Sequence, residues 1–205
     1  RVKQDLDFDF LLEDLPSLVT QSRDGIDRVR KIVADLKDFS RLDASQDWQW
    51  ADLHQGLDST LNIVNNEIKY RAEVVREYGQ LPEVECLPSQ LNQVFLNLLV
   101  NSAHAMPEGQ MGRITLRSGH DEPAHQVWLE VEDNGSGISP ENMHRLFDPF
   151  FTTKPVGKGT GLGLSLSYGI VQKHHGQITV SSELGKGTTF RIVLPVSQPK
   201  EGATP

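Results

Sequence analysis

The stretch Gly157-Lys158-Gly159-Thr160-Gly161-Leu162-Gly163-Leu164 carries a glycine at every second position and leads into a predicted helix that ends near His174. Unhindered backbone N–H groups beside a helix N-terminus form a site for anions, so the stretch predicts bound phosphates. Its spacing fits neither the dinucleotide-binding motif nor the P-loop, which excludes both of those folds. A flexible linker is the alternative, but linkers rarely carry interleaved leucines.

A second group of polar side chains lies on a helix that Pro88 is predicted to start and that ends near Ala105. Asn97, Asn101 and His104 are spaced by four and three residues, so their side chains share one face of this helix. The amide oxygen of asparagine suits Mg²⁺ when phosphates balance most of the charge of the ion. Paired asparagines on a helix are more often solvated or capping groups, and the spacing alone leaves that alternative open.

The segment Asp133-Asn134-Gly135-Ser136-Gly137-Ile138 directly follows a predicted strand. The carboxylate of Asp133 can accept a hydrogen bond from an exocyclic amine such as that of adenine. Gly135 and Gly137 allow the backbone to turn tightly and to approach a ligand. A simple turn between strands is an equally good interpretation of such an Asp and Gly cluster taken by itself.

The loop Leu146-Phe147-Asp148-Pro149-Phe150-Phe151-Thr152-Thr153-Lys154 is unusually aromatic. Aromatic side chains beside a glycine-rich segment favour a lid that packs over or next to a ligand. Packing of Phe147 and Phe150 in the core is the alternative. Lys154 could pair with a phosphate, although a surface lysine usually has no specific partner.

The remaining pattern predicts a helix at about 52–66 and a short helix that Ser139 and Pro140 start and that ends near Phe147. Alternating apolar residues predict strands, in chain order at 48–51, 73–78, 83–86, 113–118, 127–132, 177–182 and 188–194. Helices and antiparallel strands are mixed, which is typical of the α+β class.

An amphipathic helix is predicted at residues 11–39, before this domain. Its apolar residues alternate steps of four and three, except near Ser22 and Gly25, and form the seam of a helical bundle: Leu11, Leu15, Leu18, Val29, Ile32, Leu36 and Phe39. A surface helix packed on its own domain is the alternative. The polar run after Leu42 marks a boundary. We therefore expect a helical segment at 1–46, the main domain at 47–196 and a disordered tail at 197–205.

The composition describes a folded protein with an acidic balance. With 20 Lys and Arg against 28 Asp and Glu, the net charge is −8, which disfavours binding to nucleic acid or to an anionic membrane. No apolar run approaches the roughly 18 residues that cross a bilayer. The start at Arg1 is neither a signal peptide nor an initiator methionine, so we expect a piece of a longer protein. The single cysteine, Cys86, is predicted to be a buried structural thiol.

Five segments, in this order, resemble the sequence boxes of bacterial sensor histidine kinases. They are the N box at 97–101, the first glycine box at 133–138, the F box at 147–151, the second glycine box at 159–164 and the last glycine box at 187–190. The resemblance covers about 48–196. It implies the Bergerat α/β sandwich of the GHKL ATPases, with a mixed, largely antiparallel sheet and helices on one face. The helix predicted at 11–39, with the stretch 25–41, also looks like the second helix of the dimerisation and phosphotransfer hairpin, part of a four-helix bundle.

By this resemblance the chain would bind ATP with Mg²⁺. Asn101 would hold the metal ion, Asn97 and His104 would lie near the phosphates, and Asp133 would recognise adenine with support from Thr188. The catalytic group would comprise Asn97, Asn101, His104 and Lys154. The wider nucleotide site would add Gly135, Gly137 and Ile138, together with residues of the lid at 150–160 and just after it: Phe150, Thr152, Thr153, Gly157, Gly159, Thr160, Gly161, Leu162, Gly163 and Leu164.

One part of the family pattern is missing. The phosphoacceptor of the family is a histidine followed by an acidic residue on the first helix of the hairpin, and no histidine precedes His54. His120-Asp121 is the only such pair, but we expect it in a turn between strands and reject it. The chain as given should therefore not phosphorylate itself.

The implied reaction is transfer of the γ-phosphoryl group of ATP to a histidine on a missing or separate helix, and then to an aspartate of a response regulator. The expected partners are a receiver domain and a second copy bound through the N-terminal helix, without nucleic acid and without membrane contact by this segment. We expect the domain to lie in the cytoplasm, and the parent protein could be anchored in the inner membrane.

An ATP hydrolase of the gyrase or chaperone type would need a glutamate at the position of Asn97. A pseudokinase that acts by conformation alone is the other alternative, which the intact boxes disfavour.

Overall fold

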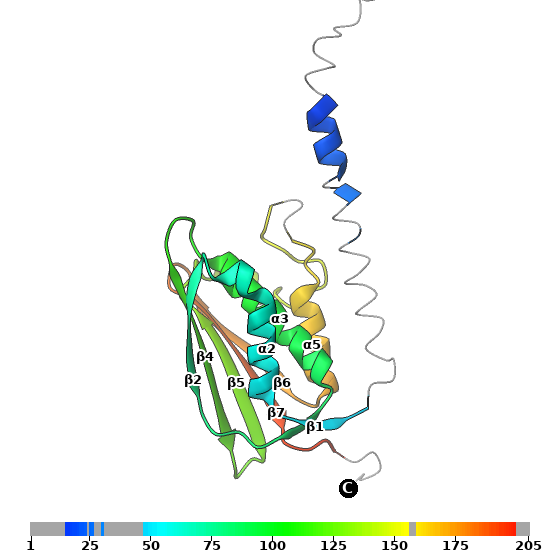
Figure 1. Cartoon of the computed structure of the whole chain (residues 1–205), viewed down its shortest axis with the longest axis vertical. Helices are drawn as coiled ribbons and strands as arrows, with labels where there is room; N and C mark the ends of the chain where they lie inside the picture. The colour runs from blue at the N-terminus through cyan, green and yellow to red at the C-terminus, as the bar shows by residue number, and fades with distance from the viewer. Residues whose placement is uncertain (1–14, 24, 27–29, 31–46, 156–158, 200–205) are drawn as a thin grey trace, which may run out of the picture.

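The main body of the molecule has two layers, a five-stranded sheet and three helices that cover one face of it (Figure 1). The computed structural model describes residues 15–23, 25–26, 30, 47–155 and 159–199 of the chain. The sheet and its helices are formed by residues from both of the long described stretches. Elements far apart in the sequence therefore meet around a common core.

Five strands form the sheet in the order β2-β4-β5-β7-β6. Their bounds are β2 Ala72–Tyr78, β4 Gly112–Asp121, β5 Gln126–Asp133, β6 Gln177–Glu183 and β7 Gly187–Pro195. β2 pairs with β4 in parallel, and the other neighbours pair antiparallel. The sheet is mixed and largely antiparallel with helices on one face, which confirms the α+β class and the Bergerat-type sandwich.

The helical layer consists of α2 (Leu53–Ile68), α3 (Pro88–Ala105) and α5 (Gly163–Lys173). Asp52 begins α2, because its Oδ1 accepts a hydrogen bond from the backbone N–H of His54 at 2.8 Å. Pro88 lies in the first turn of α3, as predicted. A separate antiparallel pair, β1 (Gln49–Ala51) and β3 (Val84–Cys86), lies outside the main sheet. Cys86 is buried, as predicted, and burial raises the pKa of its thiol to about 11.

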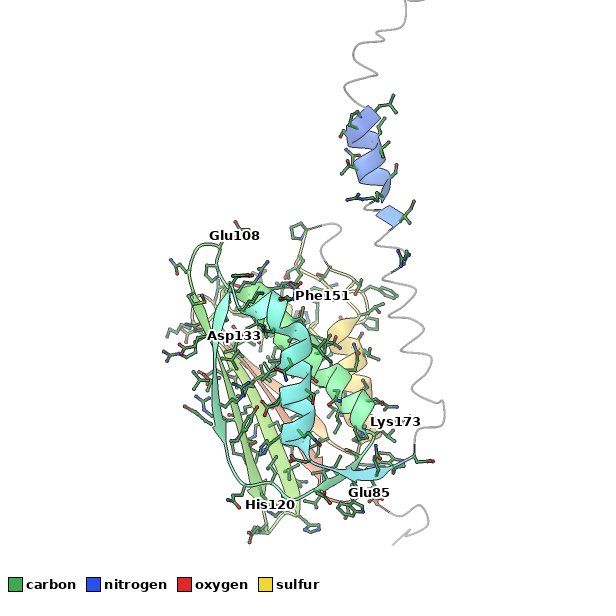
Figure 2. The ribbon with its side chains drawn as sticks, in the orientation of Figure 1. Glu85, Glu108, His120, Asp133, Phe151 and Lys173 are labelled. Carbon is green, nitrogen blue, oxygen red and sulfur yellow. The ribbon has the colours of Figure 1, made fainter. Side chains whose placement is uncertain are left out.

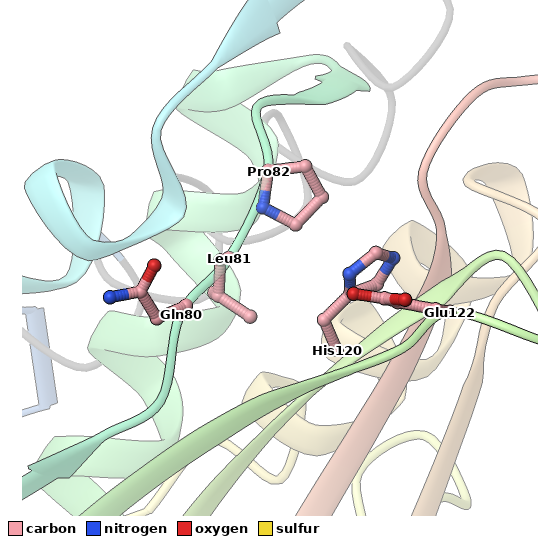
Figure 3. Close-up of a pocket in the computed structure, with 5 residues that line it drawn as sticks. All are labelled: Gln80, Leu81, Pro82, His120 and Glu122. Carbon is pink, nitrogen blue, oxygen red and sulfur yellow. The ribbon is translucent and has the colours of Figure 1, made fainter.

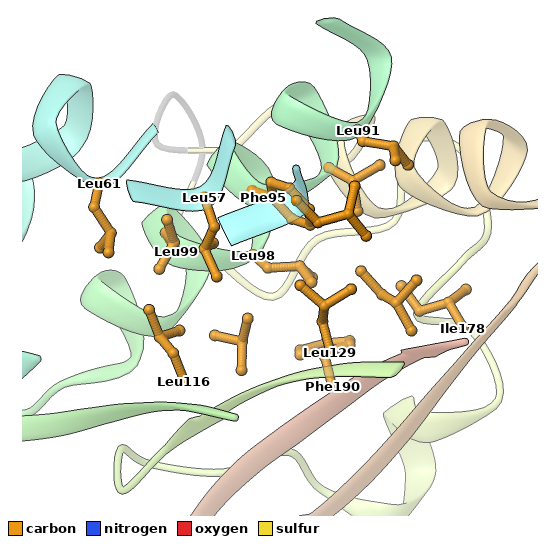
Figure 4. Packing of buried hydrophobic residues seen from close by; sticks show 14 of the residues in the cluster. Leu57, Leu61, Leu91, Phe95, Leu98, Leu99, Leu116, Leu129, Ile178 and Phe190 are labelled. Atoms are coloured by element: carbon orange, nitrogen blue, oxygen red, sulfur yellow. The ribbon is translucent and has the colours of Figure 1, made fainter. Parts of the chain in front are cut away.

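The hydrophobic core lies between the two layers (Figure 4). Val127, Leu129 and Val131 of β5 alternate with less buried residues and belong to this core. Figure 4 shows Phe95 and Leu98 of α3 on the helical side of Leu129. Burial of each such side chain contributes about 1.5–3 kcal/mol. Asp133 ends the same buried row of β5. The carboxylate of Asp133 is therefore buried on the same face of β5 as the apolar core residues.

Two local predictions are wrong. The helix α4 covers only Pro140–Met143, and Ser139 makes no side-chain capping bond, because the chain turns early and buries Leu146. His120 and Asp121 are the last residues of β4 rather than part of a turn. They pair antiparallel with Val127 and Gln126, the first residues of β5.

The two ends of the chain are described only in part. Residues 15–23 are helical, and Leu15 and Leu18 are each 50% exposed. The other predicted seam positions lie outside the described residues, so the bundle stays a prediction. Within the predicted tail, Gln198 donates its backbone N–H and its side-chain amide to Glu85 at 2.8 and 2.9 Å. None of the helices in the described ranges is long and apolar enough to span a bilayer.

A buried imidazole, that of His174, joins the end of α5 to the start of α3. Its Nε2 accepts the backbone N–H of Leu87 at 3.0 Å, so its Nδ1 carries the proton and donates to the C=O of Ile170 at 2.8 Å. Burial lowers the pKa of His174, mainly because a charged ring is poorly solvated there. A protonated ring would also lose the bond from Leu87.

We expect His174 to make the domain less stable in mild acid. Its folded-state pKa lies below the unfolded value of about 6.5, so its contribution is complete above that pH and is lost as the pH falls towards the folded-state pKa. Urea titrations at pH 7.5 and pH 5.5 measure the free energy of unfolding. Between these two pH values, that free energy should fall by about 1 kcal/mol more in the wild type than in His174→Gln. Equal losses in the two proteins would show that another group causes the acid sensitivity.

Candidate functional site

The predicted site residues gather at the end of the sandwich where α3 ends. Figure 2 shows Asp133 and Phe151 towards this end, and His120 and Glu85 at the opposite end. The backbone N–H of Ser136 donates to the C=O of Ala105 at 2.9 Å, which fixes the first glycine box against the last turn of α3. The segments that resemble family boxes are therefore neighbours in space.

Asn97 holds the second glycine box against α3. Its Nδ2 donates to the C=O of Gly163 at 3.0 Å and to Oγ of Ser167 at 3.2 Å. Gln93, one turn earlier on α3, donates to Oδ1 of Asn97 at 3.4 Å. Sequence reasoning missed Gln93 and Ser167, because neither belongs to a motif and only the packing of α3 on α5 brings them together.

Asn101 and His104 face the lid. The ammonium group of Lys154 donates to Oδ1 of Asn101 at 3.2 Å and lies 3.1 Å from Nδ1 of His104. Burial lowers the pKa of His104 and the charges of Lys154 and Arg71 add to this effect, while Glu67 opposes it. A neutral ring can accept a hydrogen bond from the ammonium group. The predicted polar face of α3 therefore binds a cation of the lid.

Asp133 is a buried carboxylate, only 4% exposed. Its Oδ1 accepts the backbone N–H of Gly135 at 2.9 Å, and in the sheet it lies opposite the buried Thr188 of β7. Burial raises the pKa of Asp133, and the hydrogen bond from Gly135 opposes that shift. A buried acceptor of this kind favours a ligand that brings its own N–H donor.

The hydroxyl of Ser102 is a neighbour of Asp133 that the sequence did not reveal. Ser102 is 1% exposed, and its Oγ makes no hydrogen bond of regular geometry within the described part of the chain. It lies close enough to Asp133 to favour the charged carboxylate. Because buried polar groups are normally paired, a neighbouring donor and acceptor of this kind are suited to a common ligand.

The residues after β5 form a closely packed turn. A Cβ atom on Gly135 would lie 2.6 Å from the carbonyl oxygen of Ala105, and Gly137 has a φ of +68°. The backbone N–H of Ile138 donates to Oγ of Ser182 at 2.9 Å, and the side chain of Ile138 packs against the core. Glycine is therefore required at both positions, and Ile138 anchors the turn from inside.

A backbone hydrogen bond joins the two ends of the lid segment. The N–H of Phe150 donates to the C=O of Gly161 at 2.9 Å, and these residues have φ values of +67° and +70°. Within the lid, Oγ1 of Thr152 accepts the N–H of Lys154 at 3.2 Å, and a Cβ atom on Gly159 would lie 2.5 Å from the same oxygen. Thr153 is exposed. The predicted site residue Gly157 lies outside the described residues.

The aromatic residues of the lid region divide into two groups. Phe147 packs against the core and contacts the ring of Tyr168, with 5.4 Å between centroids. Phe150 is 61% exposed, and the guanidinium of Arg145 lies 4.5 Å from the ring centroid of Phe151. The core alternative therefore holds for Phe147, and Phe150 stays on the surface of the lid.

The N-terminus of α5 points its backbone groups towards this end of the sandwich. Within the described residues its N-cap residue, Leu162, makes no side-chain capping bond, and Oγ1 of Thr160 accepts the N–H of Leu162 at a long 3.5 Å. Leu162 is buried and Leu164 packs against the core, so the leucines anchor the segment whose glycines leave the backbone accessible. The partial positive charge of a helix N-terminus favours an anion.

Two open hollows lie near the ends of the sandwich. One of about 540 Å³ adjoins the end of α3 and is lined by Tyr70, Arg71, Met106 and residues 107–111. The other, of about 480 Å³, lies by the end of β4 and is lined by Gln80, Leu81, Pro82, His120 and Glu122 (Figure 3). Neither hollow is lined by a residue that the sequence predicts for the site. We place the candidate site at the α3 end because the contacts of Asn97, Asn101 and Lys154 lie there.

Comparison with known proteins identifies the family of this domain. Residues 86–198 match the family described as histidine kinase-, DNA gyrase B-, and HSP90-like ATPase. The sensor kinase CckA of Brucella abortus is 51% identical over 119 residues, which are 52% of this chain and 12% of that protein. The signal transduction histidine-protein kinase AtoS of Escherichia coli is 36% identical over 174 residues, 84% of this chain and 28% of AtoS. The chain thus spans less than a third of the length of either relative.

Solved structures show the same fold. The mycobacterial sensor histidine kinase MprB superposes with a TM-score of 0.64 at 29% identity, covering 75% of this chain and all of that one. Full-length ShkA in complex with AMPPNP superposes with a TM-score of 0.73 at 25% identity, covering 90% of this chain and 39% of ShkA.

Proposed function

This chain belongs to the ATP-binding catalytic domains of two-component sensor histidine kinases, and on that premise we propose that it donates the γ-phosphoryl group of Mg-ATP to a histidine side chain. The observation that carries the proposal is the meeting of three elements at one end of the sandwich. α3 brings Asn97 and Asn101, the lid brings Lys154, and α5 brings an uncapped N-terminus. These groups bind anions or the cations that accompany them.

The base of the nucleotide would lie against Asp133. Its buried carboxylate can accept a hydrogen bond from the exocyclic amine of adenine. The N–H of Gly135 donates to Oδ1 of the same carboxylate, and Thr188 lies opposite Asp133 on β7. Guanine presents a carbonyl oxygen in place of that amine, which would face the carboxylate unfavourably. The site should therefore prefer ATP to GTP.

Magnesium fits the amide oxygen of Asn101. No cluster of three or more acidic, cysteine or histidine side chains that could hold a metal occurs in the described ranges, so the ion must take most of its ligands from phosphates and water. Oδ1 of Asn101 already accepts a hydrogen bond from a cation, the ammonium group of Lys154. When bound, the ion neutralises charge on the transferred phosphoryl group. Lys154 adds a second positive charge beside it.

The acceptor of the phosphoryl group would come from outside this chain. No histidine precedes His54, and His120 lies in β4 near the end of the molecule opposite the site. Asn97 stands where hydrolysing members of the wider family would need a glutamate, and an amide cannot take a proton from water. These features support transfer to a separate helix over hydrolysis. Binding and positioning would then be the contribution of this domain.

The wider pathway follows from the same proposal. The phosphoryl group would pass from the histidine to an aspartate of a response-regulator receiver domain. Two copies would associate through the N-terminal helix, and the domain would work in the cytoplasm.

A phosphotransfer assay tests the proposed function. The chain is mixed with Mg-[γ-³²P]ATP and a separately expressed helix from the parent protein that carries its acceptor histidine. We expect acid-labile, alkali-stable label on the helix only when the chain is present, and none on the chain alone. Release of inorganic phosphate without labelled helix would instead support a hydrolase.

A further inference from the structure

The carboxylate of Glu67 contacts the candidate site from a second helix. Glu67 lies in the last turn of α2, and its Oε2 is 3.5 Å from Nε2 of His104 in the last turn of α3. The side chain of Glu67 is 55% exposed and that of His104 is 29% exposed. No sequence box includes Glu67, and its role follows only from this contact.

The partners of the ring define which nitrogen of His104 carries the proton. Nδ1 lies 3.1 Å from the ammonium group of Lys154, which can only donate, so Nδ1 must present its lone pair. The ring proton of the neutral form is then on Nε2, which faces the carboxylate of Glu67. A carboxylate behind a functional imidazole fixes both the tautomer and the orientation of the ring.

His104 and Asn101 together hold the lid cation. The ammonium group of Lys154 lies 3.2 Å from Oδ1 of Asn101 and 3.1 Å from Nδ1 of His104, so it sits over the polar face of α3. A ring turned by half would present its carbon Cδ2 to the ammonium group, and the other tautomer would present an N–H, so either change would lose this contact. The orientation of His104 therefore controls one of the contacts that place Lys154.

We propose that Glu67 is a positioning residue: it fixes the ring of His104, and through it places Lys154 beside the terminal phosphate of ATP. The inference rests on the proposed function, because it assigns the phosphate end of the site to Asn101 and Lys154. In this role Glu67 would act through His104 and would touch neither substrate nor metal. The alternative is that Glu67 and His104 form an ordinary exposed ion pair, which would contribute little to stability and would not affect the affinity for ATP relative to ADP.

Nucleotide titrations of Glu67→Ala separate these two roles. Loss of positioning should weaken binding of Mg-ATP by about tenfold. Binding of Mg-ADP, which lacks the phosphate that Lys154 would meet, should stay within twofold of wild type. Glu67→Gln, which keeps an acceptor oxygen, should have a smaller effect than Glu67→Ala. Glu73→Ala removes an exposed carboxylate from β2 and is the matched control, with both affinities unchanged.

A double-mutant cycle with His104→Ala completes the test. If Glu67 acts through His104, then Glu67→Ala should cause no further loss of Mg-ATP affinity once the ring is absent. Equal weakening of ATP and ADP binding, additive losses in the cycle, or unchanged affinities in Glu67→Ala would each overturn the inference. The proposed function would survive these outcomes. It fails separately if the wild-type chain binds neither nucleotide.

Discussion

Asp133→Asn should lower the affinity of the chain for Mg-ATP by about 100-fold, which corresponds to about 2.7 kcal/mol. The N–H of Gly135 donates to Oδ1 of Asp133, so an asparagine would keep its oxygen there and turn its NH₂ group towards the ligand. Two donors, the amide NH₂ and the adenine amine, would then face each other in a buried recess. Sites that lose a required buried hydrogen bond in this way lose several orders of magnitude in selectivity.

Isothermal titration calorimetry measures this loss directly. Asp121→Asn makes the same chemical change at the far end of β4, where Oδ1 of Asp121 accepts the N–H of Ala124, and it should bind Mg-ATP normally. Without nucleotide, Asp133→Asn should melt at or above the wild-type temperature, because burial raises the pKa of Asp133 and the charge is therefore unfavourable there. Wild-type affinity in Asp133→Asn would place the adenine elsewhere.

Gly187→Ala should destabilise the whole domain by about 3–5 kcal/mol. Gly187 starts β7 with a φ of +124°, and a Cβ atom there would overlap the backbone carbonyl of Asp133 and lie 2.8 Å from Cα of Asn134. Both atoms belong to backbone and cannot move aside cheaply. A loss of this size is a large part of the 5–15 kcal/mol that typically stabilises a domain.

The hairpin supplies its own control for this prediction. Gly185 also has a positive φ, +79°, but a Cβ atom there would meet nothing within 4 Å. Gly185→Ala should therefore cost only about 1–2 kcal/mol from backbone strain. Urea unfolding of the two variants and the wild type provides the comparison. If both glycine variants lose the same stability, the close approach to Asp133 is not what requires Gly187.

Periodic patterns explain why much of the fold could be predicted. Pro88 and the breakers after Ala105 bracket α3, and its bounds agree with the prediction. The strict alternation from Val127 to Val131 shows which face of β5 is buried. Such patterns report burial of one face of one element, and they need no knowledge of its neighbour.

Contacts between elements could not be read from those patterns. Gln93 and Ser167 meet at Asn97 only because α3 packs on α5, and Glu67 meets His104 only because α2 ends beside α3. The short α4 shows the same limit, since burial of Leu146 overrides the local helix signal. The roles of the site residues remain predictions that the proposed variants test.

The most direct test of an ATP site at the α3 end is a titration of the isotopically labelled chain, followed by backbone amide NMR. Mg-ATP should shift the amide signals of Gly135, Gly161 and Gly163 in a saturable manner, while Mg-GTP at the same concentrations should leave them in place. The amides of Gly79 and Gly119, in and next to β4 at the other end of the sandwich, should not respond to either nucleotide. Saturable shifts at Gly79 and Gly119 with unchanged signals from the three box glycines would contradict the account.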